Sequence, residues 1–110
     1  MPISIRRVEA REIIASTVDP QGHRVVVLAR IWTEKVLRDH PEMAPHLDDV
    51  VETVHRPDHV SADPRDERLR YYRRHVGPSR WLLAVVSYEQ VPARLITALA
   101  LRKDPPSWNA

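Results

Sequence analysis

Three strand-like runs follow one another closely in the C-terminal part of the chain, and this succession constrains the fold more than any other feature. They span residues 68 to 75, 81 to 88 and 93 to 101, and each is rich in residue types that are common in strands. The connections between them are short, whereas a parallel pair needs a crossover of a dozen or more residues. We therefore expect an antiparallel meander.

A β-hairpin is predicted over residues 12 to 28. Two β-branched runs flank the sequence Asp-Pro-Gln-Gly, which has proline at the second and glycine at the fourth position of a type I turn. The preceding residues 5 to 12 fit the helical and the strand period equally poorly, so both alternatives stay open there.

Two helices are expected between the hairpin and the meander. Residues 30 to 39 have a helical composition with Trp32 and Val36 on one apolar stripe, and Pro41 forces the preceding residue out of helical geometry. A second helix is predicted over residues 45 to 55, with a proline and two aspartates in its first turn. Its apolar residues recur at positions i, i+3, i+4 and i+7: Leu47, Val50, Val51 and Val54.

This order of elements predicts a single α+β domain over residues 1 to 103. Two helices should pack on one face of a mostly antiparallel sheet and leave the other face available. Residues 61 to 67 read as a polar connector, and residues 104 to 110 as a flexible C-terminal tail.

Composition excludes several classes of function. The absence of cysteine removes disulfides, thiolate nucleophiles and the common zinc sites, and it fits a reducing cytoplasm. With two glycines in the whole chain there is no phosphate-binding glycine loop, so nucleotide-dependent chemistry is not expected. No apolar stretch reaches the length of a signal peptide or a transmembrane span. We expect a cytoplasmic protein with no membrane partner.

Six histidines raise the question of a metal site. His55 and His59 have the i, i+4 spacing of a helical metal pair, but Pro57 lies between them and separates them from a common helix face. His40 and His46 lie on either side of another proline-marked corner. Solvated loop histidines are the better interpretation, and we expect no metal and no other cofactor.

Charge is distributed unevenly along the chain. The formal net charge of +2 is too small to indicate a nucleic-acid-binding protein by itself. Arginines nevertheless cluster between residues 65 and 80, while acidic residues gather between residues 39 and 58. A folded chain with one basic face is the expected result.

The strand "RLRYYRRH", residues 68 to 75, carries most of these cations. The strand period of two assigns alternate residues to opposite faces: Arg68, Arg70, Tyr72 and Arg74 on one, Leu69, Tyr71, Arg73 and His75 on the other. One interpretation is an edge strand that its charges keep soluble. The other is a phosphate-binding strand whose rings stack on unpaired bases. Trp81 either joins that platform or belongs to the core.

Two further residues have both a structural and a functional interpretation. Thr97 carries the hydroxyl group in the otherwise apolar run of residues 95 to 101. It is there either because threonine is favourable in strands or because it donates a hydrogen bond to a ligand. His40 precedes a proline at a helix corner, where it either caps the helix or transfers protons near neutral pH.

Taken in order, several short motifs resemble a known family: "HPEM", a helix, then "RPDHV", "YYRR", "GPSRWLLAVV" and "LITA". The pattern is similar to the small nuclease-like domains of the barnase/EndoU/colicin/RelE-like group, which occur in phage-linked, toxin–antitoxin and polymorphic-toxin settings. It covers about residues 25 to 102, and the order of the motifs is more specific than any one of them. The resemblance implies two helices on an antiparallel sheet and ribonuclease activity that needs no metal.

By this resemblance, catalytic roles are expected for His40, Tyr72, Arg74 and Thr97. The histidine or the tyrosine would transfer protons, the arginine would neutralise phosphate charge, and the threonine would donate to phosphate. Substrate binding is expected of further residues: Lys35, Arg70, Arg73, Trp81 and Arg102. Lys35 stands where many relatives have a second histidine, and lysine transfers protons less well unless burial lowers its pKa.

The sequence therefore predicts a toxin-like, metal-independent endoribonuclease that cleaves RNA by attack of the ribose 2′-hydroxyl. The alternative is a catalytically inactive module of the same fold that binds RNA or a protein. The expected partners are RNA and an acidic antitoxin or immunity protein that covers the basic face.

Overall fold

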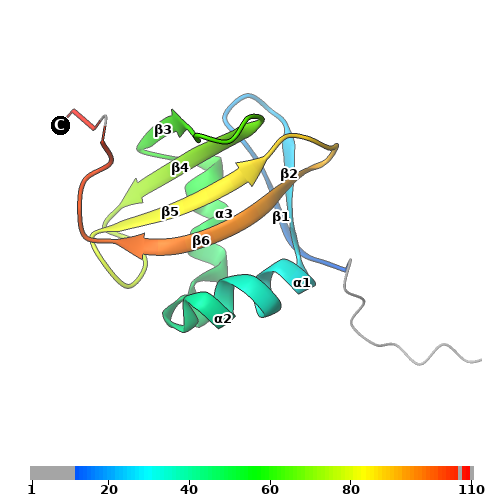
Figure 1. The fold of residues 1–110 in the computed structure, drawn as a ribbon, viewed down its shortest axis with the longest axis horizontal. Helices are drawn as coiled ribbons and strands as arrows, with labels where there is room; N and C mark the ends of the chain where they lie inside the picture. Colours follow the sequence, from blue (N-terminus) through cyan, green and yellow to red (C-terminus); the bar gives the residue numbers. More distant parts are fainter. Residues whose placement is uncertain (1–11, 107, 110) are drawn as a thin grey trace, which may run out of the picture.

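A single six-stranded sheet, in the order β1-β2-β6-β5-β4-β3, organises the chain (Figure 1). The computed structural model describes residues 12–106, 108 and 109. All neighbouring strands are antiparallel except β2 and β6, which are parallel. In chain order the strands are β1 (Ile13–Val18), β2 (Arg24–Leu28), β3 (His59–Ala62), β4 (Arg68–Arg74), β5 (Trp81–Ser87) and β6 (Ala93–Leu101). The expected α+β class and the β4-β5-β6 meander are confirmed.

The predicted hairpin is formed by β1 and β2. At its turn the Gly22 N–H donates to the Asp19 carbonyl at 3.0 Å. Gly22 has a φ of +92°, which glycine adopts without the strain that a Cβ would add. For residues 5 to 12 the sequence favoured neither helix nor strand. Residues 5 to 11 of this stretch lie outside the described residues.

Both expected helices are present, with one shift of boundary. The first helical stretch comprises α1 (Ala29–Ile31), a π-helical turn (Trp32–Val36) and α2 (Leu37–Asp39). It ends at His40, whose φ of −137° and ψ of 69° are not helical, as Pro41 predicted. A 3₁₀ helix (Pro41–His46) follows, so α3 (Leu47–His55) begins two residues later than expected. None of the helices in the described part of the chain has the length and hydrophobicity of a transmembrane span.

The main core lies between the helices and one face of the sheet. It joins Trp32 and Val36 of the first helical stretch to Val50 and Val54 of α3 and to alternate residues of the strands. All seven residues of β5 are buried, because β5 lies inside the sheet, with residues of the main core on one face and of a second cluster on the other. A second, smaller cluster on the opposite face contains Tyr72, Trp81, Leu83 and Val85.

The strand β3 was not predicted. Residues 61 and 62, assigned to a polar connector, pair with β4 as part of β3 instead. As a result β4 lies between β3 and β5, and the edge-strand interpretation of its charges is wrong. A four-residue strand has little sequence signal of its own, and its backbone hydrogen bonds to β4 stabilise it.

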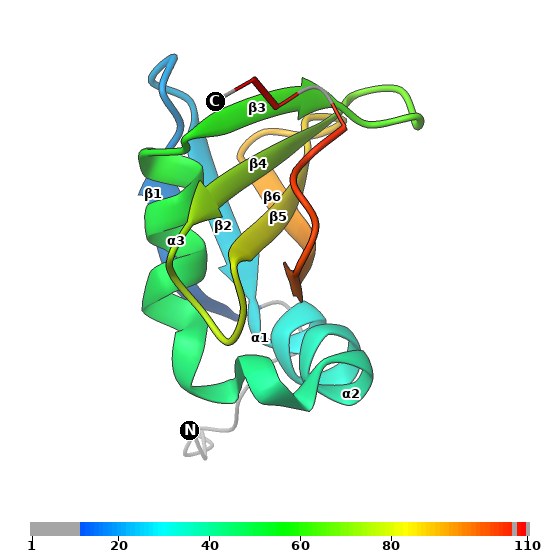
Figure 2. The ribbon, with the colours of Figure 1, turned by 90° about the vertical axis from the view of Figure 1, so that its left-hand side faces the viewer.

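The described residues of the C-terminal segment contact the sheet, and the flexible tail over residues 104 to 110 stays a prediction. The Trp81 indole N–H donates to Asp104 at 2.9 Å, and the Trp108 ring lies 5.0 Å from the Trp81 ring between centroids. Pro105 is buried. Figure 2 shows this segment running along the sheet from the end of β6 toward β3. The described part therefore covers the second cluster, because its proline and tryptophan bury apolar surface there.

Candidate functional site

An open groove of about 810 Å³ lies on the sheet face opposite the main core. Its floor is apolar and comes from alternate residues of the two central strands, among them Leu83 and Val85 of β5 and Leu99 of β6. Thr97 adds a hydroxyl to this floor. The apolar side chains of both helical stretches pack on the other face, so the groove stays open between Lys35 of the first helical stretch and the C-terminal segment.

The walls of the groove are cationic. Six positively charged residues line it: Lys35, Arg65, Arg68, Arg70, Arg102 and Lys103. The two lining carboxylates are engaged, since Asp63 accepts from Arg70 Nε at 2.8 Å and Asp104 accepts from Trp81. Within the described part of the chain, Lys35, Arg68, Arg102 and Lys103 form no ion pair. The groove therefore has a net positive charge available to an anionic ligand.

Five of the residues predicted from the sequence line this one groove: Lys35, Arg70, Tyr72, Thr97 and Arg102. Tyr72 is only 1% exposed, and its side chain is hydrogen-bonded to Arg70. Hydrogen bonds with Asp63 and Tyr72 raise the pKa of Arg70, although its burial opposes this. The buried tyrosine thus supports a fixed guanidinium at the groove.

Three other predicted residues of this region do not line the groove. Arg73 lies on the opposite face, where its Nη1 donates to the Arg56 carbonyl at 2.9 Å. Arg74 is exposed, and its guanidinium lies 4.9 Å from the centre of the Trp108 ring. Trp81 is 1% exposed and is a core residue of the second cluster.

His40 is also outside the groove. It lies at the corner after α2, with its Nδ1 3.8 Å from a carboxylate oxygen of Glu42. The structure therefore brings Tyr72 and Thr97 together but does not bring His40 to them. A proton-transfer residue for the groove has to come from another element.

Lys35 is partly buried at the groove, and its pKa is lowered. Burial lowers the pKa of this lysine, and the positive charges of Arg68 and Arg65 lower it further, while Asp39 opposes them. A partly buried lysine of this kind releases its proton more readily than a solvated one. It lies on the helical side of the groove.

A second hollow, of about 420 Å³, adjoins the groove. It lies between the β1–β2 turn and the loop that joins β3 to β4, and His23 and Tyr88 are among its lining residues. Asp63, Arg65 and Arg68 line both hollows. The loop before β4 is therefore the boundary at which the groove and the second hollow meet.

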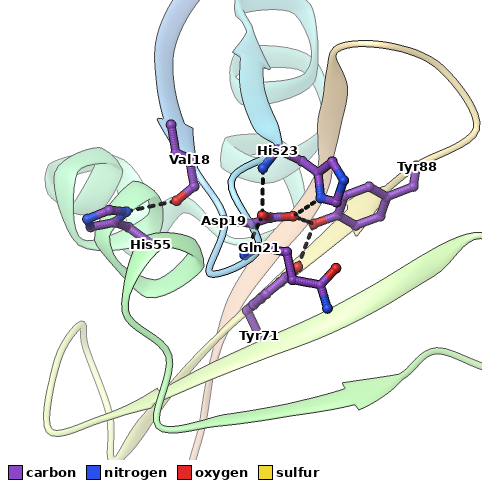
Figure 3. A network of polar contacts seen from close by, with 7 residues as sticks. All are labelled: Val18, Asp19, Gln21, His23, His55, Tyr71 and Tyr88. Atoms are coloured by element: carbon purple, nitrogen blue, oxygen red, sulfur yellow. Dashed lines mark hydrogen bonds and ion pairs between the residues drawn. The ribbon is translucent and has the colours of Figure 1, made fainter.

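A hydrogen-bonded network occupies one wall of this second hollow (Figure 3). Asp19 is 5% exposed, and its Oδ1 accepts the backbone N–H groups of Gln21 and His23, each at 2.9 Å. Its Oδ2 accepts the Tyr88 hydroxyl at 2.7 Å and lies 3.2 Å from His23 Nδ1. Because Tyr88 donates its proton to Asp19, the Tyr71 hydroxyl donates to Tyr88.

Hydrogen bonds and burial within this network set the protonation states of Asp19 and Tyr88. Burial alone would raise the pKa of Asp19, but hydrogen bonds from Tyr88 and from two backbone N–H groups lower it below its ordinary value. Burial and the hydrogen bonds with Tyr71 and Asp19 raise the pKa of Tyr88. At neutral pH Asp19 is therefore a carboxylate and Tyr88 a hydrogen-bond donor. The carboxylate accepts the proton of His23 Nδ1.

At Asp19 and its neighbours the local sequence predicts a turn and no functional role. The available signal was the histidine four residues after the aspartate, at the other end of the same turn. The partner Tyr88 lies 69 positions further along the chain, so no local pattern connects the two.

Comparison of the chain with protein-family models, with curated proteins and with solved structures found no match. Among the described residues, no three histidine or acidic side chains are grouped as a metal site requires. The fold and the site define an α+β protein with a cationic groove on its sheet and an Asp–His pair beside that groove. The resemblance to nuclease-like domains stays a prediction, and the function is inferred from this geometry.

Proposed function

We propose that the groove binds the sugar–phosphate backbone of RNA and that the chain is a metal-independent endoribonuclease. One observation carries the proposal: cations from three segments of the chain converge on a groove whose apolar floor also carries the Thr97 hydroxyl. Lys35 comes from the first helical stretch, Arg68 from β4 and Arg102 from the end of β6.

Each part of the groove suits a part of an RNA strand. The unpaired cations would neutralise phosphates, and the Thr97 hydroxyl would donate to a phosphate oxygen. Arg70, held by Asp63 and Tyr72, presents a planar guanidinium whose orientation is set before a ligand arrives. The apolar floor would contact ribose carbons and base edges.

The reaction that fits these groups is attack of the ribose 2′-oxygen on the adjacent phosphorus. A base removes the 2′-hydroxyl proton, the O2′–P bond forms and the P–O5′ bond breaks. This leaves a 2′,3′-cyclic phosphate and a 5′-hydroxyl. The groove cations would stabilise the charge that develops on phosphate. Lys35, whose pKa is lowered by burial and by Arg68 and Arg65, would donate the proton that the departing 5′-oxygen needs.

A second candidate function is RNA binding without cleavage. It is favoured by the positions of the two residues expected to transfer protons, because Tyr72 is buried against Arg70 and His40 lies outside the groove. An acidic antitoxin or immunity protein would compete with RNA for the same cations. Displacement of bound RNA by such a protein is the test of that partner.

The test uses end-labelled single-stranded RNA in excess EDTA. A Lys35→Ala/Arg68→Ala variant is compared with an Arg24→Ala/Arg80→Ala variant, which loses the same charge at exposed positions outside the groove. Binding is measured by fluorescence anisotropy in a salt series, since phosphate contacts make affinity fall steeply with salt. We expect the wild type and the control to bind RNA and to yield cyclic phosphate ends, and the groove variant to do neither. Binding without fragments supports the second candidate, and no binding by the wild type contradicts both.

A further inference from the structure

We propose that His23, held by Asp19 beside the second hollow, takes the proton from the ribose 2′-hydroxyl, and that Asp19 is its positioning residue. The inference rests on the proposed ribonuclease function and supplies the base that the groove lacks. It replaces His40 in that role.

The geometry of the Asp–His pair is that of an oriented general base. Asp19 Oδ1 is occupied by two backbone N–H groups, which leaves Oδ2 for the Tyr88 hydroxyl and for His23 Nδ1. A carboxylate at Nδ1 holds the proton on that nitrogen and leaves the lone pair on Nε2. The His23 side chain is 61% exposed, whereas that of Asp19 is 3% exposed. The proposed base is therefore accessible to RNA, and the carboxylate that orients it is buried.

The turn explains only part of this arrangement. An aspartate at the first position of a β-turn commonly accepts the backbone N–H groups of the residues that follow, and Gln21 and His23 provide them here. A turn does not require the Tyr88 hydroxyl, nor the Tyr71 hydroxyl behind it. These two tyrosines connect the hairpin to β4 and to the end of β5, so the sheet itself holds the carboxylate in position.

The second hollow is placed to receive the ribose next to a phosphate bound in the groove. Arg65 and Arg68 line both hollows, so a phosphate on these arginines would adjoin both the hollow that His23 lines and the groove that Lys35 lines. The other charged residues that face the second hollow are acidic: Asp19, Asp63, Asp66 and Glu67. This acidic surrounding disfavours a second phosphate there and suits a neutral sugar with its hydroxyl groups.

Side chains of this chain can carry out both proton transfers of the reaction. His23 Nε2 accepts the 2′-hydroxyl proton as the O2′–P bond forms, and Arg65 and Arg68 stabilise the negative charge on the phosphate oxygens. The P–O5′ bond breaks, and the Lys35 ammonium gives a proton to the 5′-oxygen. Exchange of one proton with water then restores neutral His23 and charged Lys35.

The first experiment compares His23→Gln and Asp19→Asn with the wild type and with His55→Gln. His55 is a matched control because it is exposed and also contacts the hairpin, with its Nδ1 2.8 Å from the Val18 carbonyl. RNA binding and cleavage in EDTA are measured for all four proteins. We expect unchanged binding throughout, cleavage at least about 100-fold slower in His23→Gln, and a wild-type rate in His55→Gln. Asp19→Asn should lower the maximal rate without changing the RNA concentration at half-maximal rate.

The outcomes separate this inference from the proposed function. Cleavage by His23→Gln at the wild-type rate overturns the role of His23 and leaves the ribonuclease proposal intact. Binding without cleavage by the wild type overturns the catalytic role while the groove remains an RNA site. Absence of both binding and cleavage in the wild type overturns the ribonuclease proposal, and with it the reaction assigned to His23.

A second readout needs no RNA. Nitrogen-15 spectra of the histidine rings report which nitrogen of His23 carries the proton in the neutral form. We expect Nδ1–H in the wild type, and loss of that preference in Asp19→Asn while the backbone spectrum stays folded. A wild-type ring protonated on Nε2 overturns the orientation by Asp19, even if RNA is cleaved.

Discussion

The Arg74 guanidinium lies 4.9 Å from the centre of the Trp108 ring, so the C-terminal segment contacts an exposed residue of the most basic strand. The same tryptophan packs against Trp81 and His59 in T-shaped geometry. Trp108 therefore joins β3, β4 and β5 on the face that carries the groove.

Replacement of Trp108 by alanine should destabilise the protein. The change removes the cation–π contact with Arg74 and the edge contact with Trp81, which together are worth about 1–2 kcal/mol. Urea unfolding measures the effect. Trp108→Phe, which keeps a ring at this position, should recover part of the loss. An unchanged midpoint in Trp108→Ala would mean that the segment does not stabilise the sheet.

Asp19 should make stability depend on acid pH. Its pKa is lowered from the ordinary value of 3.8 because the hydrogen bonds from Tyr88 and the backbone outweigh burial. A carboxyl group with a depressed folded-state pKa stabilises the protein above its unfolded value, and this contribution is lost as the pH falls through the folded value. Unfolding free energies at pH 7 and pH 3 should therefore differ more in the wild type than in Asp19→Asn. Equal differences would contradict the assignment.

Tyr88→Phe should destabilise the protein at neutral pH. It removes the donor to Asp19 Oδ2 and leaves the Tyr71 hydroxyl without its partner, in a region where burial makes an unmet hydrogen bond unfavourable by about 1–3 kcal/mol. Chemical denaturation measures the change. Tyr71→Phe/Tyr88→Phe should be less destabilised than the sum of the single variants, because both members of one hydrogen bond are removed together.

Lys35→Arg should separate binding from cleavage. Arginine keeps the positive charge for phosphate but does not release a proton at accessible pH, so RNA should still bind while cleavage falls about 100-fold. In the wild type, cleavage should decline as the pH rises through the lowered pKa of Lys35, hence below its ordinary value of 10.5. A pH–rate profile measures this alkaline limb. Full activity of Lys35→Arg would rule out proton donation by this residue.

Gly22→Ala tests the turn that supports the Asp–His pair. Nothing lies within 4 Å of the added Cβ, so the effect comes from the φ of +92° alone and should be about 1–2 kcal/mol. Thermal or urea unfolding measures the loss, and the nitrogen-15 spectrum of His23 shows whether the ring moves with the turn. A variant as stable as the wild type would show that the turn relaxes to another conformation.

Local patterns were enough to predict most of the fold. The turn residues at 19 to 22 predicted the hairpin, and the apolar spacing in residues 47 to 54 predicted α3. The strand period also assigned Arg70 and Tyr72 to one face and Arg73 to the other, as the structure has them. These features depend on residues a few positions apart. Their backbone preferences and side-chain periodicity can therefore be recognised in a short stretch of sequence.

Local sequence patterns predicted most of the elements and the cations that they carry, whereas packing of the whole chain brings particular residues together. The pairing of β3 with β4, the parallel contact of β2 with β6 and the packing of Trp108 on Trp81 have no local signal. The bond between Tyr88 and Asp19 joins residues 69 positions apart. Such contacts form because packing the whole chain makes burial of these groups favourable, and short patterns in the sequence do not contain that information.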